Sequence, residues 1–222
     1  MNETPPQPPQ PGATPGAPGG EPYALTFDVP YPDRDLNRVS TGFRIFTVIP
    51  IAIVLAAVGG GYEGFFGRGA AAGGGILFIP ALLMILFRQK YPRWWFDWNR
   101  ELLRFSNRVG AYLLLLDDRY PSTDEQQYVR LELEYPDVTN ELNRWLPLVK
   151  WFLAIPHYIV LVFLHIALFL AVIGAWFAIL FTGRYPRAIF DFAVGVMRWT
   201  NRVGAYAFVL VTDRYPPFRL AP

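Results

Sequence analysis

Residues 151–181 read WFLAIPHYIVLVFLHIALFLAVIGAWFAILF, a run that contains no Asp, Glu, Lys or Arg. A single α-helix of this length would extend about 46 Å at about 1.5 Å per residue, whereas the hydrocarbon core of a bilayer is about 30 Å thick. Two shorter apolar runs, residues 43–58 and 74–87, are separated by a glycine-rich stretch that holds Glu63 and Arg68. The sequence therefore predicts an α-helical membrane protein.

The composition agrees with this class. Of the 222 residues, 53% are apolar and only 17% are charged, and the basic residues gather between the apolar runs. A basic nucleic-acid-binding protein would not segregate its charges in this way. The chain has no cysteine, which excludes disulfides and thiolate metal sites. No nucleotide loop, zinc motif or nucleophile elbow is found, so we expect no cofactor, and hydrolase or kinase chemistry is disfavoured.

An internal repeat organises the chain, because short strings recur in the same order in both halves. Leu36-Asn37-Arg38 recurs as Leu142-Asn143-Arg144, and Ile49-Pro50 recurs as Ile155-Pro156. The other matched strings are Tyr31-Pro32 with Tyr135-Pro136, Tyr91-Pro92-Arg93 with Tyr185-Pro186-Arg187, Asn107 to Tyr112 with Asn201 to Tyr206, and Asp118 to Pro121 with Asp213 to Pro216.

Each repeat unit is expected to contain a short strand, a transmembrane helical hairpin, an amphipathic helix and a second strand. The first unit covers residues 23–122 with a hairpin at about 43–87, and the second covers 128–218 with a hairpin at about 145–183. Residues 1–22, rich in Pro and Gly, are expected to form a disordered tail. The expected fold is thus two tandem repeats of membrane helices with a small antiparallel β element.

Each unit is expected to begin with a strand of alternating apolar and polar residues and to end with an apolar strand. In residues 128–134, Val129, Leu131 and Leu133 alternate with charged residues, as in a sheet with one face in water. Residues 24–29 form the matching strand of the first unit. We expect both to pair with the apolar segments that end each unit, residues 110–116 and 204–211, in an antiparallel sheet.

The second half resembles a family of bacterial membrane proteins of unknown function, the DUF4389 family. The resemblance is carried by Ile155-Pro156-His157, by Trp176 to Pro186, by Arg202 to Tyr206 and by Asp213 to Phe218. It extends more loosely to the first half, which has Phe87-Arg88-Gln89-Lys90 in place of Phe181 to Arg184. The resemblance implies a membrane protein and no particular activity.

The number of membrane helices stays open between four, in two hairpins, and two long tilted spans. The repeat favours hairpins, because each would return to its starting side, although no clear turn residue lies between Leu164 and Phe169. On the hairpin reading every Lys and Arg except Arg68 lies on the side of both termini, which the positive-inside rule makes cytoplasmic. We therefore expect a multi-pass protein of the bacterial plasma (inner) membrane with both termini in the cytoplasm.

Charged residues recur at matched positions in and after the amphipathic helices, residues 93–108 and 187–202. Unpaired charge near lipid is costly, so these groups are expected to form a structural ion network across a partly buried interface. A catalytic carboxylate at Asp97 or Asp191, in an enzyme acting on lipid, is a less favoured hypothesis. The predicted network comprises Asp97, Arg104, Arg108, Asp118, Arg119, Asp191, Arg198, Arg202, Asp213 and Arg214.

Two further pairs of residues within the apolar regions have possible roles. His157 and His165 are candidate intramembrane polar groups, either in a proton relay or simply bonded to a neighbouring helix. Their separation, about 12 Å on a continuous helix, is too large for one metal ion. Pro50 and Pro156 are expected to kink helices or to mark their starts.

Two functions remain open from the sequence. The first is a non-enzymatic membrane scaffold or accessory protein, whose basic cytoplasmic face binds anionic headgroups and whose tail could bind a protein partner through Pro5 to Pro9. The alternative is a small transporter or lipid-handling protein with a pathway between the repeats. Neither reading involves nucleic acid, and the oligomeric state is not predicted.

Overall fold

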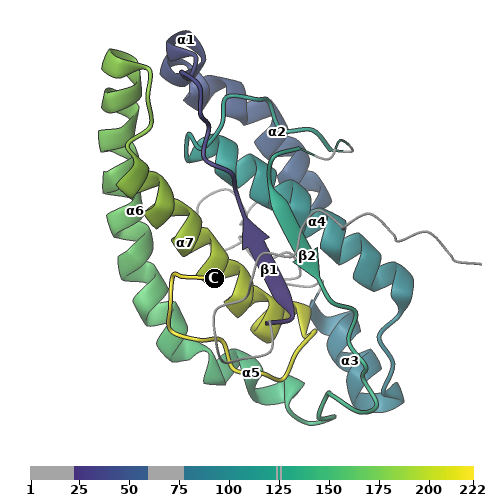
Figure 1. Cartoon of the computed structure of the whole chain (residues 1–222). Coiled ribbons are helices and arrows are strands. Elements are labelled where there is room, and N and C mark those ends of the chain that lie inside the picture. The colour runs from purple at the N-terminus through teal and green to yellow at the C-terminus, as the bar shows by residue number, and fades with distance from the viewer. Residues whose placement is uncertain (1–22, 60–77, 124, 126) are drawn as a thin grey trace, which may run out of the picture.

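The computed structural model describes residues 23–59, 78–123, 125 and 127–222. This part of the chain is mostly helical, with one two-stranded antiparallel sheet (Figure 1). The tail at residues 1–22 and most of the glycine-rich stretch lie outside the described residues. The elements are β1 (Leu25–Asp28), α1 (Arg38–Gly42), α2 (Arg44–Val58), α3 (Phe78–Arg88), α4 (Arg93–Leu113), β2 (Arg130–Leu133), α5 (Pro147–Leu153), α6 (Ile155–Thr182), α7 (Arg187–Gly204) and the π-helix η2 (Ala205–Val209).

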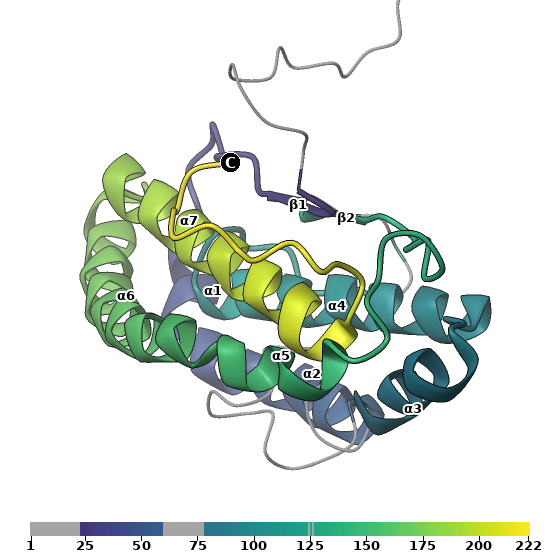
Figure 2. The ribbon, with the colours of Figure 1, turned by 90° about the horizontal axis from the view of Figure 1, so that it is seen from below.

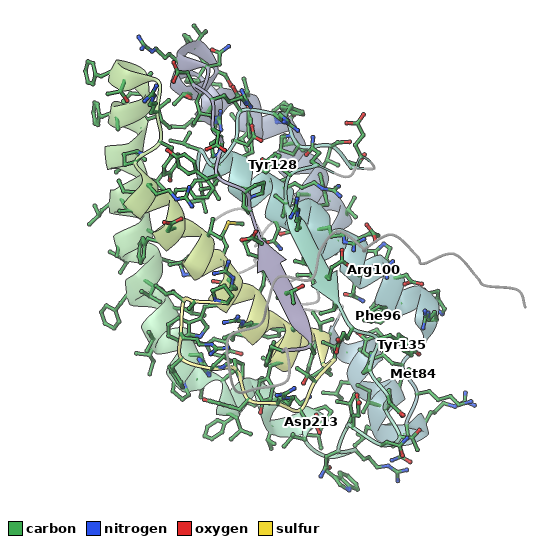
Figure 3. The ribbon with its side chains drawn as sticks, viewed as in Figure 1. Met84, Phe96, Arg100, Tyr128, Tyr135 and Asp213 are labelled. Carbon is green, nitrogen blue, oxygen red and sulfur yellow. The ribbon has the colours of Figure 1, made fainter. Side chains whose placement is uncertain are left out.

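The elements form layers. Figure 2 shows the sheet on one side of the molecule, α4 and α7 beneath it, and α2, α3 and α5 on the side away from the sheet, with α6 curving along α7. Side chains fill the space between the layers (Figure 3), where the ring of Phe96 on α4 meets that of Tyr135 edge to face at 5.1 Å. The sheet and the helices α2, α3 and α5 therefore lie on opposite sides of α4 and α7, and α6 flanks α7.

The two expected strands exist, but they pair with each other. β1 and β2 are antiparallel, with Leu25 opposite Leu133 and Phe27 opposite Leu131. These four side chains face the core, while the alternate residues are exposed, as the period-two pattern predicted.

The prediction that residues 110–116 and 204–211 form strands is wrong. α4 continues to Leu113, and α7 continues through the π-helix to Val209. A short apolar run has no period that separates a strand from a buried helix end, and here the preceding helix simply continues. The sheet consequently consists of one strand from each half of the chain.

The hairpin predicted for residues 145–183 is also wrong. α5 ends at Leu153, and α6 then runs without interruption for 28 residues. The segment between Leu164 and Phe169 contains no residue that breaks a helix, so the hydrogen-bond ladder is not interrupted. Pro156 is the second residue of α6, a position where its missing N–H costs nothing, whereas Pro50 lies inside α2.

In the first half, two helices flank the glycine-rich stretch, most of which lies outside the described residues. α2 has 15 residues and α3 has 11. At about 1.5 Å per residue they extend about 22 Å and about 16 Å, less than the thickness of a hydrocarbon core.

Residues with a left-handed backbone occupy corresponding places in the two halves. Leu115 (φ 66°) and Leu210 (φ 62°) each lie three residues before the Asp-Arg-Tyr-Pro string, and Gln89 (φ 46°) and Gly183 (φ 79°) each lie two residues before Tyr-Pro-Arg. Positive φ is uncommon outside glycine, so its recurrence at matched positions of the sequence is informative. A left-handed leucine therefore follows each long amphipathic helix at the same distance from the Asp-Arg-Tyr-Pro string.

Tyrosines link the two halves in reciprocal pairs. The hydroxyl of Tyr31 donates to the carbonyl of Tyr185, and the hydroxyl of Tyr135 donates to the carbonyl of Tyr91. Each hydroxyl therefore bonds to the other half of the chain, and the acceptor is in both cases the backbone carbonyl of the tyrosine in a Tyr-Pro-Arg string. Tyr91 and Tyr185 donate in turn to the carbonyls of Val209 and Leu114, at 2.8 and 3.1 Å.

Arginines repeat this exchange. Arg104 on α4 donates from Nε to the carbonyl of Leu131 on β2, and Arg198 on α7 donates from Nε to the carbonyl of Phe27 on β1, each at 2.9 Å. Leu131 and Phe27 are themselves opposite each other in the sheet. Each helix thus holds the strand that belongs to the other half.

Asn107 and Asn201 meet where α4 and α7 cross. The amide of Asn107 donates to Oδ1 of Asn201 at 2.8 Å, and the amide of Asn201 donates to Oδ1 of Asn107 at 2.6 Å. Both side chains are buried. The two equivalent residues therefore satisfy each other in the centre of the molecule.

We expect Asn107→Ala to lower the free energy of unfolding by about 1–3 kcal/mol, because it leaves the buried Asn201 amide without its partner. Replacing both residues by leucine removes both polar groups and should restore most of the loss. Ser106→Ala, one residue away and half-buried, is the control and should change stability by less than about 0.5 kcal/mol. Denaturant titration in detergent micelles measures these values, and a double variant no better than the single would contradict the expectation.

Candidate membrane-contacting surface

α6 has two contrasting faces. Its exposed side chains are large and apolar, and they recur every three or four residues from one end of the helix to the other. A helix with this pattern presents a continuous apolar stripe to its surroundings. The stripe comprises Ile155, Ile159, Val162, Phe163, Ile166, Phe169, Leu170, Ile173, Phe177 and Phe181, of which Phe181 is 77% exposed.

The opposite face of α6 packs on the protein. Leu161, Leu168, Ala175 and Ile179 are buried there. His157 is buried on the same face, where its Nδ1 accepts a hydrogen bond from the indole N–H of Trp199 on α7 at 3.0 Å. α6 packs on the rest of the protein through this buried face. Packing within the fold therefore does not explain the apolar stripe on the exposed face.

The neighbouring helices extend the apolar stripe into a surface. α2, α3 and α5 lie on the side of the molecule away from the sheet (Figure 2), and each of them carries exposed apolar side chains. We define the apolar face as the stripe on α6 together with these side chains: Ile45, Phe46, Ile49, Ile53, Val54 and Val58 on α2, Ile79, Leu83 and Phe87 on α3, and Leu148, Val149, Trp151, Phe152 and Leu153 on α5. The helix beneath, α7, contributes no exposed large apolar side chain.

Polar groups on these helices bond to their own backbone. Nδ1 of His165 lies 2.7 Å from the carbonyl of Leu161, one turn earlier, and in the Nδ1–H tautomer it donates to it. The hydroxyl of Thr182 donates to the carbonyl of Ala178 at 2.7 Å. The indole N–H of Trp151 likewise donates within α5. Side chains that satisfy themselves in this way need no water, which suits them to an apolar solvent.

Only α6 is long and apolar enough to cross a membrane among the described helices. The expectation of four membrane helices is not supported.

Basic residues border the apolar face at both of its ends. Arg184 follows the end of α6 and pairs with Asp35 at 3.2 Å. At the other end, Arg144 precedes α5 and donates to Gln89 at 2.8 Å. Exposed tryptophans accompany this second end, at Trp94 and Trp145, which are 70% and 65% exposed. Aromatic and basic residues together are typical of the boundary between hydrocarbon and water.

A buried cation occupies the corresponding place in each half, and neither cation is among the site residues predicted from the sequence. Lys150 on α5 is fully buried; its Nζ donates to the carbonyl of Thr212 and pairs with Asp213, both at 2.7 Å. Its Nζ also lies 5.2 Å from the centre of the Tyr206 ring. Burial lowers the pKa of Lys150 from its usual range, and Asp213 opposes this shift without cancelling it.

Arg44 on α2 is the counterpart. It is buried, donates to the carbonyls of Tyr112 (3.0 Å) and Asp117, and lies 4.3 Å from the Tyr112 ring centre. Arg44 and Lys150 each follow a matched Asn-Arg string by six residues, a spacing that alignment of the repeats could have revealed. Both cations tie the start of an apolar helix to the turn that ends the amphipathic helix.

The matched aspartates join the same regions by a second contact. Asp118 accepts a hydrogen bond from the backbone N–H of Asn37 at 3.2 Å, and Asp213 accepts one from that of Asn143 at 2.6 Å. Asp118 also pairs with Arg34, which donates to it from both terminal nitrogens. Burial alone would raise the pKa of Asp118, but the bonds from Arg34 and Asn37 outweigh it and lower the pKa from 3.8 to about 2.

Acid should therefore weaken the contact between Asp118 and the start of α1. Because the folded pKa is depressed, this stabilisation is present above about pH 4 and is lost as the pH falls from 3.8 to about 2. Asp118→Asn should remove this part of the pH dependence and cost about 1–3 kcal/mol at neutral pH. Unfolding curves at several pH values test this, with the exposed Asp33→Asn as control; an unchanged acid limb in Asp118→Asn would contradict it.

The remaining residues of the predicted ion network lie in several separate places. Asp97 and Asp191 make local pairs with Arg100 and Arg187 on their own helices, both at 3.3 Å. Arg104 and Arg198 reach the strands, where they pair with Glu132 (2.8 Å) and Asp28 (3.3 Å). Arg108 donates to the carbonyl of Ser122, and Arg202 donates to the carbonyl of Ala221, each at 3.0 Å. Arg119 lies 3.8 Å from Asp117. The carbonyl of Arg214 accepts a hydrogen bond from the hydroxyl of Tyr23 at 3.2 Å.

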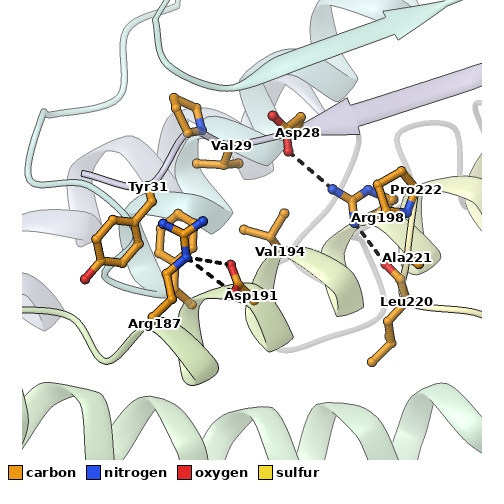
Figure 4. A pocket seen from close by; sticks show the side chains of 12 residues that line it. Asp28, Val29, Tyr31, Arg187, Asp191, Val194, Arg198, Leu220, Ala221 and Pro222 are labelled. Carbon is orange, nitrogen blue, oxygen red and sulfur yellow. Dashed lines mark hydrogen bonds and ion pairs between the residues drawn. The ribbon is translucent and has the colours of Figure 1, made fainter. Parts of the chain in front are cut away.

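A pocket of about 440 Å³ lies on the sheet side of α7 (Figure 4). Its four charged side chains are matched in two pairs, Arg187 with Asp191 and Arg198 with Asp28. Arg198 also donates to the carbonyl of Leu220 at 2.9 Å. Because these charges compensate each other within the protein, they give no basis for assigning a ligand. Nor do three His, Cys, Asp or Glu side chains of the described residues converge on a potential metal site.

Comparison with known proteins identifies one domain within the second half of the chain. Residues 145–219 match DUF4389, a domain of unknown function, and the match occurs once. No curated protein and no solved structure matches the chain. The matched segment contains α5, α6, α7 and η2, together with the Lys150–Asp213 pair. The chain therefore carries a DUF4389 domain at residues 145–219.

Proposed function

We propose that this chain is a non-enzymatic membrane scaffold or accessory protein, built from two copies of one unit and attached to lipid by its apolar face. The apolar face carries the proposal. So many exposed large apolar side chains on neighbouring helices are rare in soluble proteins, and they are expected to be covered by lipid or by another protein. The back-bonded polar groups and the basic and aromatic border favour lipid.

The two-copy organisation is supported by the reciprocal contacts. The sheet has one strand from each half of the chain. The tyrosine hydrogen bonds and the bonds from arginine to a strand also occur twice, and in each case a residue of one half bonds to the other half. Matched residues also share their backbone turns and their buried cations. Two unrelated halves would have no reason to repeat these features.

The alternative, a transporter with a pathway through His157 and His165, has less support. The ring of His157 is stacked at 3.9 Å on that of Phe218 and hydrogen-bonded to Trp199, as expected of a packed core residue. His165 lies on the exposed side of α6 and bonds to its own helix. The two histidines thus face in different directions.

The expected partner is a bilayer with anionic headgroups, which would attract the basic residues around the apolar face. A bacterial plasma membrane with both termini in the cytoplasm stays a prediction from the sequence. A protein partner bound through Pro5 to Pro9 also stays a prediction, because the tail lies outside the described residues.

Membrane flotation of cell extracts tests the proposal. The variant Ile166→Lys/Phe169→Lys/Ile173→Lys places three charges on the exposed stripe of α6, where each replaced side chain forfeits about 1.5–3 kcal/mol of burial. We expect the fraction that floats with membranes, or resists carbonate extraction, to fall at least tenfold.

The matched control is Glu134→Lys/Thr139→Lys/Ala188→Lys, which adds three lysines at exposed positions outside the apolar face. It should float like the parent protein. Equal flotation of both triple variants, or a parent protein that stays in the soluble fraction, would overturn the proposal.

A further inference from the structure

The orientation of α6 is constrained by its neighbour α7. A short loop, Gly183 to Pro186, joins the end of α6 to the start of α7, and Trp199 near the end of α7 bonds to His157 near the start of α6. The two helices are therefore antiparallel and lie side by side over most of the length of α7 (Figure 1). If α6 enters a bilayer, most of α7 must therefore lie at the same depths as α6.

The other face of α7 is polar. It carries the exposed pair Arg187–Asp191 near one end and Arg198 with Asp28 of β1 near the other. If α6 crossed a bilayer perpendicular to its plane, these charges and the open edges of the two-stranded sheet would lie at the depth of the hydrocarbon. Buried charge and unpaired strand edges are both costly there.

The charge at the two ends of α6 gives a second, independent argument. The α6 end carries the exposed Arg38 and Arg184, held together by the bond from Leu36 N to the Gly183 carbonyl at 2.8 Å. The α5 end carries the exposed Lys90 and Arg144. A spanning helix would put one of these clusters on each side of the membrane, which the positive-inside rule disfavours. Both clusters can meet the headgroups of the same leaflet only if the helix lies flat.

We propose that α6 lies in the plane of the membrane, within one leaflet, with α2, α3 and α5 beside it and the sheet in water. The inference rests on the proposed function, because it takes lipid as the solvent of the apolar face. The short lengths of α2 and α3 fit it, since neither needs to reach the far side. The protein then enters the bilayer from one side and does not cross it.

Spin-label depth measurements test this, and the absence of cysteine in the native chain makes single-cysteine labelling direct. Labels at Ile159, Ile166, Ile173 and Phe181 lie on one face of α6, seven or eight residues apart. In vesicles of phosphatidylcholine and phosphatidylglycerol, collision with oxygen and with a water-soluble nickel chelate reports the depth of each label. We expect all four at a similar depth, about 5–10 Å below the headgroups. Labels at Glu134 and Ala188 should collide only with the chelate.

A spanning helix would give a different profile. The label at Ile166 would then lie about 20 Å deeper than that at Phe181, from 15 residues at about 1.5 Å each. Such a profile would overturn the in-plane orientation and leave membrane attachment intact. Labels that collide with neither reagent would mean that protein covers the apolar face, which also overturns it. A protein that fails to float with the vesicles would remove the proposed function itself.

Sidedness gives a second measurement on the full chain. Cysteines at Glu141 and Arg184 lie near the two ends of the α5–α6 array, at exposed positions. In sealed membranes, an impermeant thiol reagent should label both from the same side. Labelling from opposite sides would contradict the in-plane orientation.

Discussion

Lys150→Ala should lower the free energy of unfolding by about 3–5 kcal/mol, the effect expected when one member of a buried ion pair is removed. The substitution leaves the carboxylate of Asp213 and the carbonyl of Thr212 without their cation. It also removes the ammonium group from beside the Tyr206 ring. Denaturant titration in detergent micelles, followed by circular dichroism, measures the loss.

Arg144→Ala is the matched control, because Arg144 is a cation six residues earlier that is exposed and bonds to the amide of Gln89. It should cost less than about 1 kcal/mol. A double-mutant cycle with Asp213→Asn should show strong coupling with Lys150→Ala and little with Arg144→Ala. If Lys150→Ala were as mild as the control, the buried pair would have no part in holding α5 to the end of α7.

Cutting the chain between its two halves should not separate them. A protease site placed within residues 123–127 would divide the full-length folded protein, and we expect the fragments to remain together on size exclusion at micromolar concentration. The contacts that cross the cut include the whole sheet, the tyrosine bonds and the Asn107–Asn201 pair. Together they should form an interface like that of an obligate dimer.

A substitution inside this interface provides the control. Phe27→Asp puts a charge at a buried position of β1, where Phe27 faces Leu131, and the cut protein should then separate into its halves. Glu134→Lys, at an exposed position just beyond β2, should leave the cut protein intact. Fragments of the unmodified protein that separate without denaturant would show that the exchanged contacts contribute little.

The sequence predicted the local elements better than their partners. The two strands and both amphipathic helices were predicted where the structure has them, because alternation and helical periodicity are properties of short segments. The pairing of β1 with β2 was missed, since a strand's own pattern says which face is buried and nothing about which strand lies beside it. That information resides in the reciprocal contacts of residues far apart in the chain.

Lys150 shows the same limit for the candidate site. In the sequence it is a lone cation beside an apolar run, a position from which lysine commonly reaches water. The structure instead places its ammonium between the Thr212 carbonyl and Asp213, more than sixty residues away. Asp118 and Asp213 were recognised as matched acids, but their partners Arg34 and Lys150 could not be identified without the fold.

If the chain is built from two copies of one unit, as proposed, the π-helix at Ala205–Val209 explains how the copies can differ in length and still fit together. From Tyr112 to Leu115 there are three steps along the chain, whereas from Tyr206 to Leu210 there are four. A π-turn accommodates one extra residue by widening the hydrogen-bonded ring, and the residues beyond it keep their positions. On the two-copy proposal, an insertion or deletion of one residue should therefore be tolerated at this turn, and a gap in an alignment of the two halves belongs there.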